Sequence, residues 1–153
     1  MGDAIPPSTW DAYTNSVVTV DLPTGPLTAV PTDDEPSGRL PNGLAEPVHV
    51  VTAWNPGSRE LDAEANARRN AELREELERR NAAWYPARGA APDDSWHEDG
   101  FAITGWSRQD ACALARAHDQ AAVFELGTGQ LTVVSADLDH VESRPCTIVT
   151  ADA

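Results

Sequence analysis

The sequence predicts an α+β fold: a mixed or antiparallel sheet of about five to six strands, two helices packed on one face, and an added N-terminal hairpin. Three observations support this class. Short β-branched or apolar runs recur along the chain, two segments of helical period lie between them, and the order from Val48 onward is β-α-β-β-α-β, which is the split βαβ pattern. A three-layer arrangement would satisfy the same order.

The first third of the chain predicts a hairpin between irregular segments. Residues 1–9 are rich in proline and are expected to be loose. The β-branched run 16–20 and the run 27–30 are expected to form two short strands, because a Pro-Thr-Gly-Pro turn separates them. Residues 31–47, again rich in proline, are expected to form an irregular loop.

The central segment predicts the most buried strand and the longer helix. Residues 48–54 are nearly continuously apolar, which favours a central strand covered on both faces. A helix is expected from about Leu61 to Asn81, with Asp62 as its N-cap and Glu64 in its first turn. Its apolar stripe is thin, so this helix is expected to pack on one side only.

The remaining elements complete one domain over residues 10–136. Strands are expected at 81–86 and 96–105, and a second helix is expected from Ser107, its N-cap, to about His118. Residues 121–126 and 130–135 are expected to form a hairpin. Residues 137–153 have little period and are expected to be a C-terminal tail or an edge strand.

Composition narrows the classes of function. The 153 residues include 25 Asp plus Glu and 11 Lys plus Arg, for a formal net charge of −14. This acidity argues against binding a nucleic-acid backbone, which needs clustered positive charge. The two cysteines make neither a disulfide framework nor a zinc cluster. With no apolar run of membrane-spanning length and no signal peptide, we expect a cytoplasmic protein that does not bind membranes.

The strongest candidate site follows the central strand. The polar turn Asn55-Pro-Gly-Ser58 feeds the first helix, on which Asn66 is expected to face the core and Arg69 lies nearby. Polar side chains beside a helix N-terminus favour an anionic or carbonyl ligand. The alternative is an ordinary turn in which Asn66 only ties down a neighbouring loop.

The second candidate is Trp96-His-Glu-Asp99, in which Glu98 is suited to acid–base chemistry. On a strand, His97 and Glu98 would point to opposite faces, so only one is expected to line a given site. We expect Glu98 to be a buried or semi-buried carboxylate that pairs with an arginine, such as Arg59 or Arg69. No histidine or cysteine spacing indicates a metal site, and no cofactor is expected.

Taken together, these pieces resemble one known family. The pattern Thr52-Ala-Trp-Asn-Pro-x-Ser58, Asn66 with Arg69 and Leu73, Trp96-x-Glu98, Phe101, Gly105, Ala111, Ala115 and Gln120-x-Ala122 resembles the bacterial domain of unknown function 3293 family over roughly residues 48–134. The resemblance implies a small cytoplasmic bacterial protein and implies no activity. The chain departs from the family at Ala65, where an acidic residue is common, and at His97, where proline is usual.

Three functional hypotheses follow. The first is a binding or regulatory module with a pocket for a nucleotide-like or other small polar ligand. The second is an acidic protein-interaction module whose polar residues are purely structural. The third is a small hydrolase or transferase that uses Glu98 as acid or base. The predicted ligand-binding residues are Asn55, Ser58, Asn66, Arg69, Trp96, Glu98 and Gln120.

Overall fold

The computed structural model describes residues 5–150, which form eight strands, three α-helices and one short 3-10 helix. In chain order these are α1 (Pro7–Thr14), β1 (Val17–Leu22), β2 (Gly25–Pro31), β3 (Val48–Thr52), η1 (Pro56–Ser58), α2 (Ala63–Arg79), β4 (Ala83–Ala90), β5 (His97–Thr104), α3 (Arg108–Ala117), β6 (Ala122–Gly127), β7 (Gln130–Ser135) and β8 (Val141–Thr150). The N-caps Asp62 and Ser107 are confirmed, since their side chains accept bonds from the backbone N–H groups of Ala65 and Asp110.

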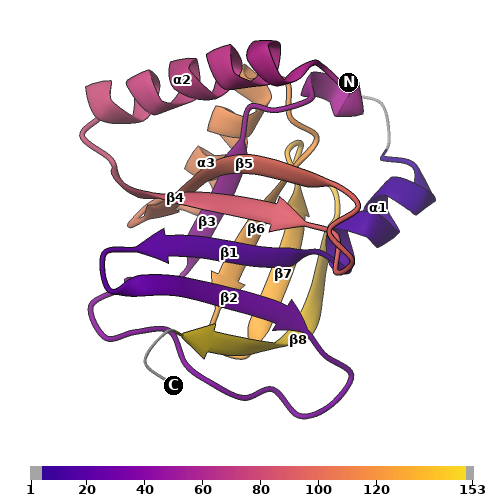
Figure 1. The fold of residues 1–153 in the computed structure, drawn as a ribbon, viewed down its shortest axis with the longest axis vertical. Helices are drawn as coiled ribbons and strands as arrows, with labels where there is room; N and C mark the ends of the chain where they lie inside the picture. Colours follow the sequence, from indigo (N-terminus) through magenta and orange to yellow (C-terminus); the bar gives the residue numbers. More distant parts are fainter. Residues whose placement is uncertain (1–4, 151–153) are drawn as a thin grey trace.

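The eight strands close into an antiparallel barrel in the order β1-β2-β8-β7-β6-β3-β5-β4, as Figure 1 shows. The predicted open sheet of five to six strands is therefore wrong, although most of its strands were placed near their observed positions. Closure depends on the pairing of β1 with β4, in which Val18 lies opposite Gly89. This contact joins segments about 70 residues apart, and no local pattern in either strand indicates its partner.

The C-terminal strand also differs from the prediction. Residues 137–153 were expected to be a tail or an edge strand, yet β8 pairs with β2 on one side and with β7 on the other. Only Cys146 and Ile148 of this strand are buried. The exposed first half of β8 hides the alternating pattern that would have indicated a strand with two neighbours.

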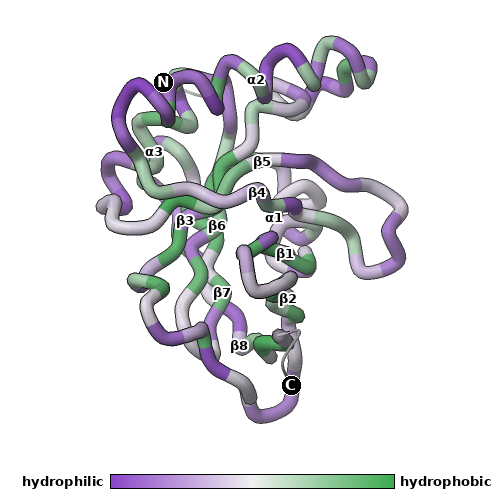
Figure 2. Tube along the Cα trace, turned by 60° about the vertical axis from the view of Figure 1, so that its left-hand side comes forward, coloured by the Kyte–Doolittle hydropathy of each residue, from purple (hydrophilic) through white to green (hydrophobic). Residues whose placement is uncertain are grey.

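Two hydrophobic cores share the barrel wall. Alternate residues of β3 point in opposite directions: Val48 and Val50 fill the barrel interior, while Val51 belongs to a second core outside it. Leu73 of α2 and Leu114 of α3 complete this outer core. Both helices therefore pack outside a closed barrel rather than on a face of an open sheet, and Figure 2 shows hydrophobic β3 and β6 near a mostly hydrophilic α2.

The two ends of the barrel are covered differently. Residues 32–47, expected to be an irregular loop, contain no helix or strand and insert the buried Leu40 into the interior core at one end. At the other end lies α1, where the buried Trp10 donates a hydrogen bond to Glu142. Residues 5–9 of the expected loose segment therefore lead into and begin a helix; residues 1–4 lie outside the described residues. The last residues of β3 and the first residues of β5 lie at the same end of the barrel as α1.

Among residues 5–150, no helix has both the length and the apolar character needed to cross a membrane.

Candidate functional site

The connection from β3 to α2 reverses the chain sharply beside the start of β5. The hydroxyl of Thr52, the last residue of β3, donates to the carbonyl of Asp99 at 2.6 Å and accepts from the N–H of Trp54 at 3.0 Å. Asn55 follows with φ of 47°, a left-handed conformation that asparagine adopts more readily than most residues. The start of α2 is thereby held against the end of β3.

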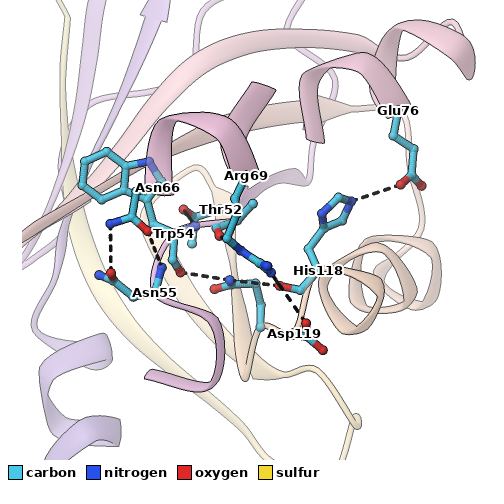
Figure 3. A network of polar contacts seen from close by, with 10 residues as sticks. Thr52, Trp54, Asn55, Asn66, Arg69, Glu76, His118 and Asp119 are labelled. Carbon is cyan, nitrogen blue, oxygen red and sulfur yellow. Dashed lines mark hydrogen bonds and ion pairs between the residues drawn. The ribbon is translucent and has the colours of Figure 1, made fainter. Parts of the chain in front are cut away.

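Asn55 and Asn66 fix each other, as Figure 3 shows. The side-chain oxygen of Asn66 accepts from the backbone N–H of Asn55 at 2.9 Å, and its amide nitrogen donates to Oδ1 of Asn55 at 3.0 Å. Oδ1 of Asn55 also accepts from the N–H of Leu61 at 3.0 Å. Because Asn66 is only 3% exposed, these bonds take the place of water for its side-chain amide.

Among residues 5–150, Glu98 is the acidic side chain that bonds to this asparagine pair. It lies on the face of β5 that carries the interior residue Ala102, and its Oε2 accepts from Nδ2 of Asn55 at 3.0 Å. The prediction that an arginine pairs with Glu98 is wrong, since neither Arg59 nor Arg69 forms a hydrogen bond or ion pair with its carboxyl group. Among the described residues, no donor bonds to the second oxygen, Oε1.

The surroundings of Glu98 make its carboxyl harder to ionise than it would be in water. Burial raises the pKa of this carboxyl above its ordinary value of 4.5, and the hydrogen bond from Asn55 offsets only part of that rise. A cationic neighbour would reverse the direction, and the described contacts supply none. The carboxyl is thus held at a location where its own charge is disfavoured.

Arg69 and Gln120 act on the backbone around the pair. Arg69 donates from Nε to the carbonyl of Ala53 and from Nη2 to the carbonyl of His118, both at 2.9 Å, and lies 3.6 Å from Asp119. Gln120 donates to the carbonyl of Trp54 at 3.0 Å. Figure 3 shows these contacts joining the end of β3, α2 and the end of α3. Both side chains position the turn that carries Asn55.

A groove of about 800 Å³ runs along this cluster at the α1 end of the barrel. Behind it, inside the barrel mouth, lies a small cavity of about 30 Å³, which is room for one or two water-sized groups. Three side chains, Tyr13, Trp96 and Glu98, line both spaces. Glu98 therefore stands at the junction of an outer groove and an inner cavity.

The predicted site residues are distributed over these spaces. Asn55 and Asn66 line the groove, and Gln120 lines the inner cavity. Arg69 lines neither, and the side chain of Ser58 lies outside the described residues. The expectation that only one of His97 and Glu98 could line a site is wrong: both line the groove, because it wraps around the end of β5.

Two aromatic residues that line the groove, Tyr13 and Trp54, were not among the predicted site residues. Tyr13 comes from α1, where a loose segment was expected to lead into a strand, and its packing on Phe124 places it over the barrel mouth. Trp54 belongs to the recognised turn, and its ring lies 5.4 Å from that of His97. The position of Trp54 between Thr52 and Asn55 could have indicated that it lines the site. Nothing in the sequence indicates Tyr13, because its position depends on how α1 packs on the closed barrel.

A second carboxylate, Glu125 of β6, is held in a contrasting way. Arg108 makes a two-bond contact to it at 2.7 and 2.9 Å, and Nε2 of the fully buried His49 lies 3.0 Å from its Oε2. The bonds from Arg108 lower the pKa of Glu125, while burial lowers the pKa of His49. This cluster lies on the outer side of the barrel wall.

Across residues 5–150, no group of three or more His, Cys, Asp or Glu side chains is arranged to hold a metal ion.

Comparison with known proteins finds one matching family model. Residues 51–123 match the family model described as "Protein of unknown function (DUF3293)", so the resemblance predicted from the residues is confirmed over this stretch. The matched segment begins in β3 and ends in β6, and it contains Asn55, Asn66, Glu98 and Gln120. No curated protein and no solved structure matches the chain.

Proposed function

We propose that the chain is a binding module whose groove at the α1 end of the barrel takes up a small polar ligand, with Glu98 and Asn55 as the contacting groups. The observation that carries this proposal is the state of Glu98. Its carboxyl lies at the junction of the groove and the inner cavity, has one amide partner, and keeps one oxygen without a donor among the described residues. A ligand N–H or O–H group would donate a hydrogen bond to that oxygen.

The rigidity around Glu98 supports a binding role. Asn55 uses its oxygen for Leu61 and Asn66, so only its amide nitrogen is left to face Glu98. A contact group held by a second layer of hydrogen bonds loses little freedom when a ligand arrives. Arg69 and Gln120 extend this layer to the backbone of the turn.

The chemistry of the groove favours some polar ligands over others. No arginine is among its described lining residues, and its charged side chains include the carboxylates Glu60 and Glu98. At the start of α2, the backbone N–H of Ala65 already donates to the side chain of Asp62 and is not available to an anionic ligand. A phosphate would therefore meet carboxylates and no arginine, so within the nucleotide-like class a base or nucleoside fits better than a phosphorylated form.

A thermal-shift screen with nucleosides, nucleotides and polar metabolites tests the proposal. A compound that binds the native state raises the melting temperature of the wild type. We expect this rise to disappear in Asn55→Ala and Glu98→Gln and to persist in Glu72→Gln, which removes an exposed acid on α2 away from the groove. If no compound shifts the wild type and both site variants only melt lower, the polar network is structural and the acidic protein-interaction role takes precedence.

One observation favours a catalytic version of the same site. The raised pKa of Glu98 is the direction that suits a general acid, as a hydrolase or transferase would require. Each compound that shifts the wild type is therefore followed for turnover by mass spectrometry. Conversion by the wild type and none by Glu98→Gln would establish an enzyme; binding without conversion would leave a binding module.

A further inference from the structure

We propose that the ligand of this groove carries a primary ammonium group, which donates to Oε1 of Glu98 while the rest of the molecule lies along the aromatic side chains. This inference rests on the proposed function and names the chemical class of its ligand. It follows from three features: the charge of the groove, the aromatic side chains around Glu98, and the size of the two connected spaces.

The charge of the groove suits a cation. Its described lining includes the carboxyl groups of Glu60 and Glu98 and the imidazole of His97, but no arginine. The 11 basic residues of the chain are all arginines, and the formal net charge of −14 favours the approach of cations over that of anions. An ammonium group beside Glu98 would provide the opposite charge that the protein itself leaves out.

Aromatic side chains flank the same carboxyl. Trp54, Trp96 and Tyr13 line the groove, and the last two continue into the inner cavity beside Glu98. The faces of tryptophan and tyrosine rings attract cations within about 6 Å, most strongly where water is excluded. Aromatic rings around a carboxylate are the combination that recognises an alkylammonium group, because charge and cation–π attraction act together.

The dimensions agree with a small head group and a longer body. The inner cavity of about 30 Å³ has room for a group the size of an ammonium ion but not for a ring. The outer groove of about 800 Å³ has room for the remainder of a small molecule. Glu98 lies where the two spaces meet, which is where the head group would stop.

Matched pairs of amines and alcohols test the inference. Tyramine is compared with tyrosol and putrescine with butane-1,4-diol, because each alcohol keeps the carbon skeleton and replaces the ammonium by a neutral hydroxyl. Dissociation constants are measured by calorimetry for the wild type, Glu98→Gln and Glu72→Gln. We expect at least one amine to bind the wild type about tenfold or more tightly than its alcohol, since charge-assisted bonds are roughly twice as strong as neutral ones. We expect Glu98→Gln to remove this preference and Glu72→Gln to keep it.

Three outcomes overturn the inference. If amines bind both variants with equally reduced affinity, they respond only to net charge. If a nucleoside or other neutral compound binds through Glu98 and no amine does, the amine inference fails while the proposed function stands. If neither the amines nor any compound of the thermal-shift screen binds, both fail.

Discussion

Glu98 and Glu125 are two carboxylates on neighbouring parts of one barrel, and their partners differ completely. Glu125 meets an arginine at 2.7 Å and a buried histidine at 3.0 Å, and its pKa is lowered. Glu98 meets one amide, and its pKa is raised. The first arrangement stabilises the folded chain with an ionised carboxylate. The second keeps a carboxyl in a location that does not favour its charge, which is typical of a residue retained for binding or catalysis.

The largest effect on stability is expected at Glu125. In Glu125→Gln, Arg108 loses its carboxylate partner and the buried His49 loses a charged one, so we expect a loss of about 2 kcal/mol in the free energy of unfolding at neutral pH. Urea unfolding followed by circular dichroism measures it. A change below about 0.5 kcal/mol would show that the cluster is too well solvated to contribute.

The same cluster predicts how acid unfolds the protein. The unfolded histidine takes up a proton as pH falls below 6.5, whereas folded His49, with its lowered pKa, does not, so stability falls with pH from that value. Below 4.5, unfolded glutamate is protonated before folded Glu125, and stability falls further. Unfolding curves between pH 7 and pH 3 should show both losses in the wild type. Glu125→Gln should retain the loss below 6.5 and lack the Glu125 contribution; a variant that tracks the wild type below 4.5 would contradict this assignment.

The next largest effect is expected at Asn66. Asn66→Ala leaves the backbone N–H and the side-chain oxygen of Asn55 each without one partner, which should lower the free energy of unfolding by about 1–2 kcal/mol. Asn70, one turn further along α2, is the matched control because its buried side-chain oxygen has no hydrogen-bond partner among the described residues. Asn70→Ala should cost less than Asn66→Ala. Equal losses would show that the Asn55–Asn66 pair has no particular role.

The smallest effect on stability is expected at Glu98. Between its ordinary pKa of 4.5 and its raised folded value, folded Glu98 holds a proton that the unfolded chain has lost, so its contribution falls as pH rises. Glu98→Gln keeps the shape and the bond from Asn55 without this pH-dependent loss. We therefore expect the variant to equal or exceed the wild type in melting temperature at pH 7, with the difference growing from pH 4 upward. A clearly lower melting temperature at pH 7 would place Glu98 with Glu125, as a structural carboxylate.

The sequence predicted local structure better than closure. Residues 48–54, the capped helices and the 121–135 hairpin were placed well, because apolar period, caps and turns are local signals. Closure was missed because it depends on β1 meeting β4 and on β8 pairing twice, and the exposed first half of β8 resembles a tail.

In the candidate site, too, residues with a local sequence signal were predicted and those that depend on long-range packing were not. Asn55, Asn66 and Glu98 were selected as polar residues from separate elements, and the structure joins them by hydrogen bonds. Arg69 was expected near Glu98 and instead binds backbone carbonyls, because charge alone does not indicate which acceptor an arginine reaches. Tyr13 was missed because its role depends on α1 covering the barrel mouth.

The most direct test compares the two carboxylates in one experiment. Carbon-13 NMR of protein labelled at the glutamate side-chain carboxyl groups follows Glu98 and Glu125 together, with assignments from Glu98→Gln and Glu125→Gln, while tyramine is added at neutral pH. We expect the Glu98 signal to move in a saturable way and the Glu125 signal to stay in place. A Glu98 signal that does not respond, or one that moves no more than the signals of exposed glutamates, would contradict this expectation.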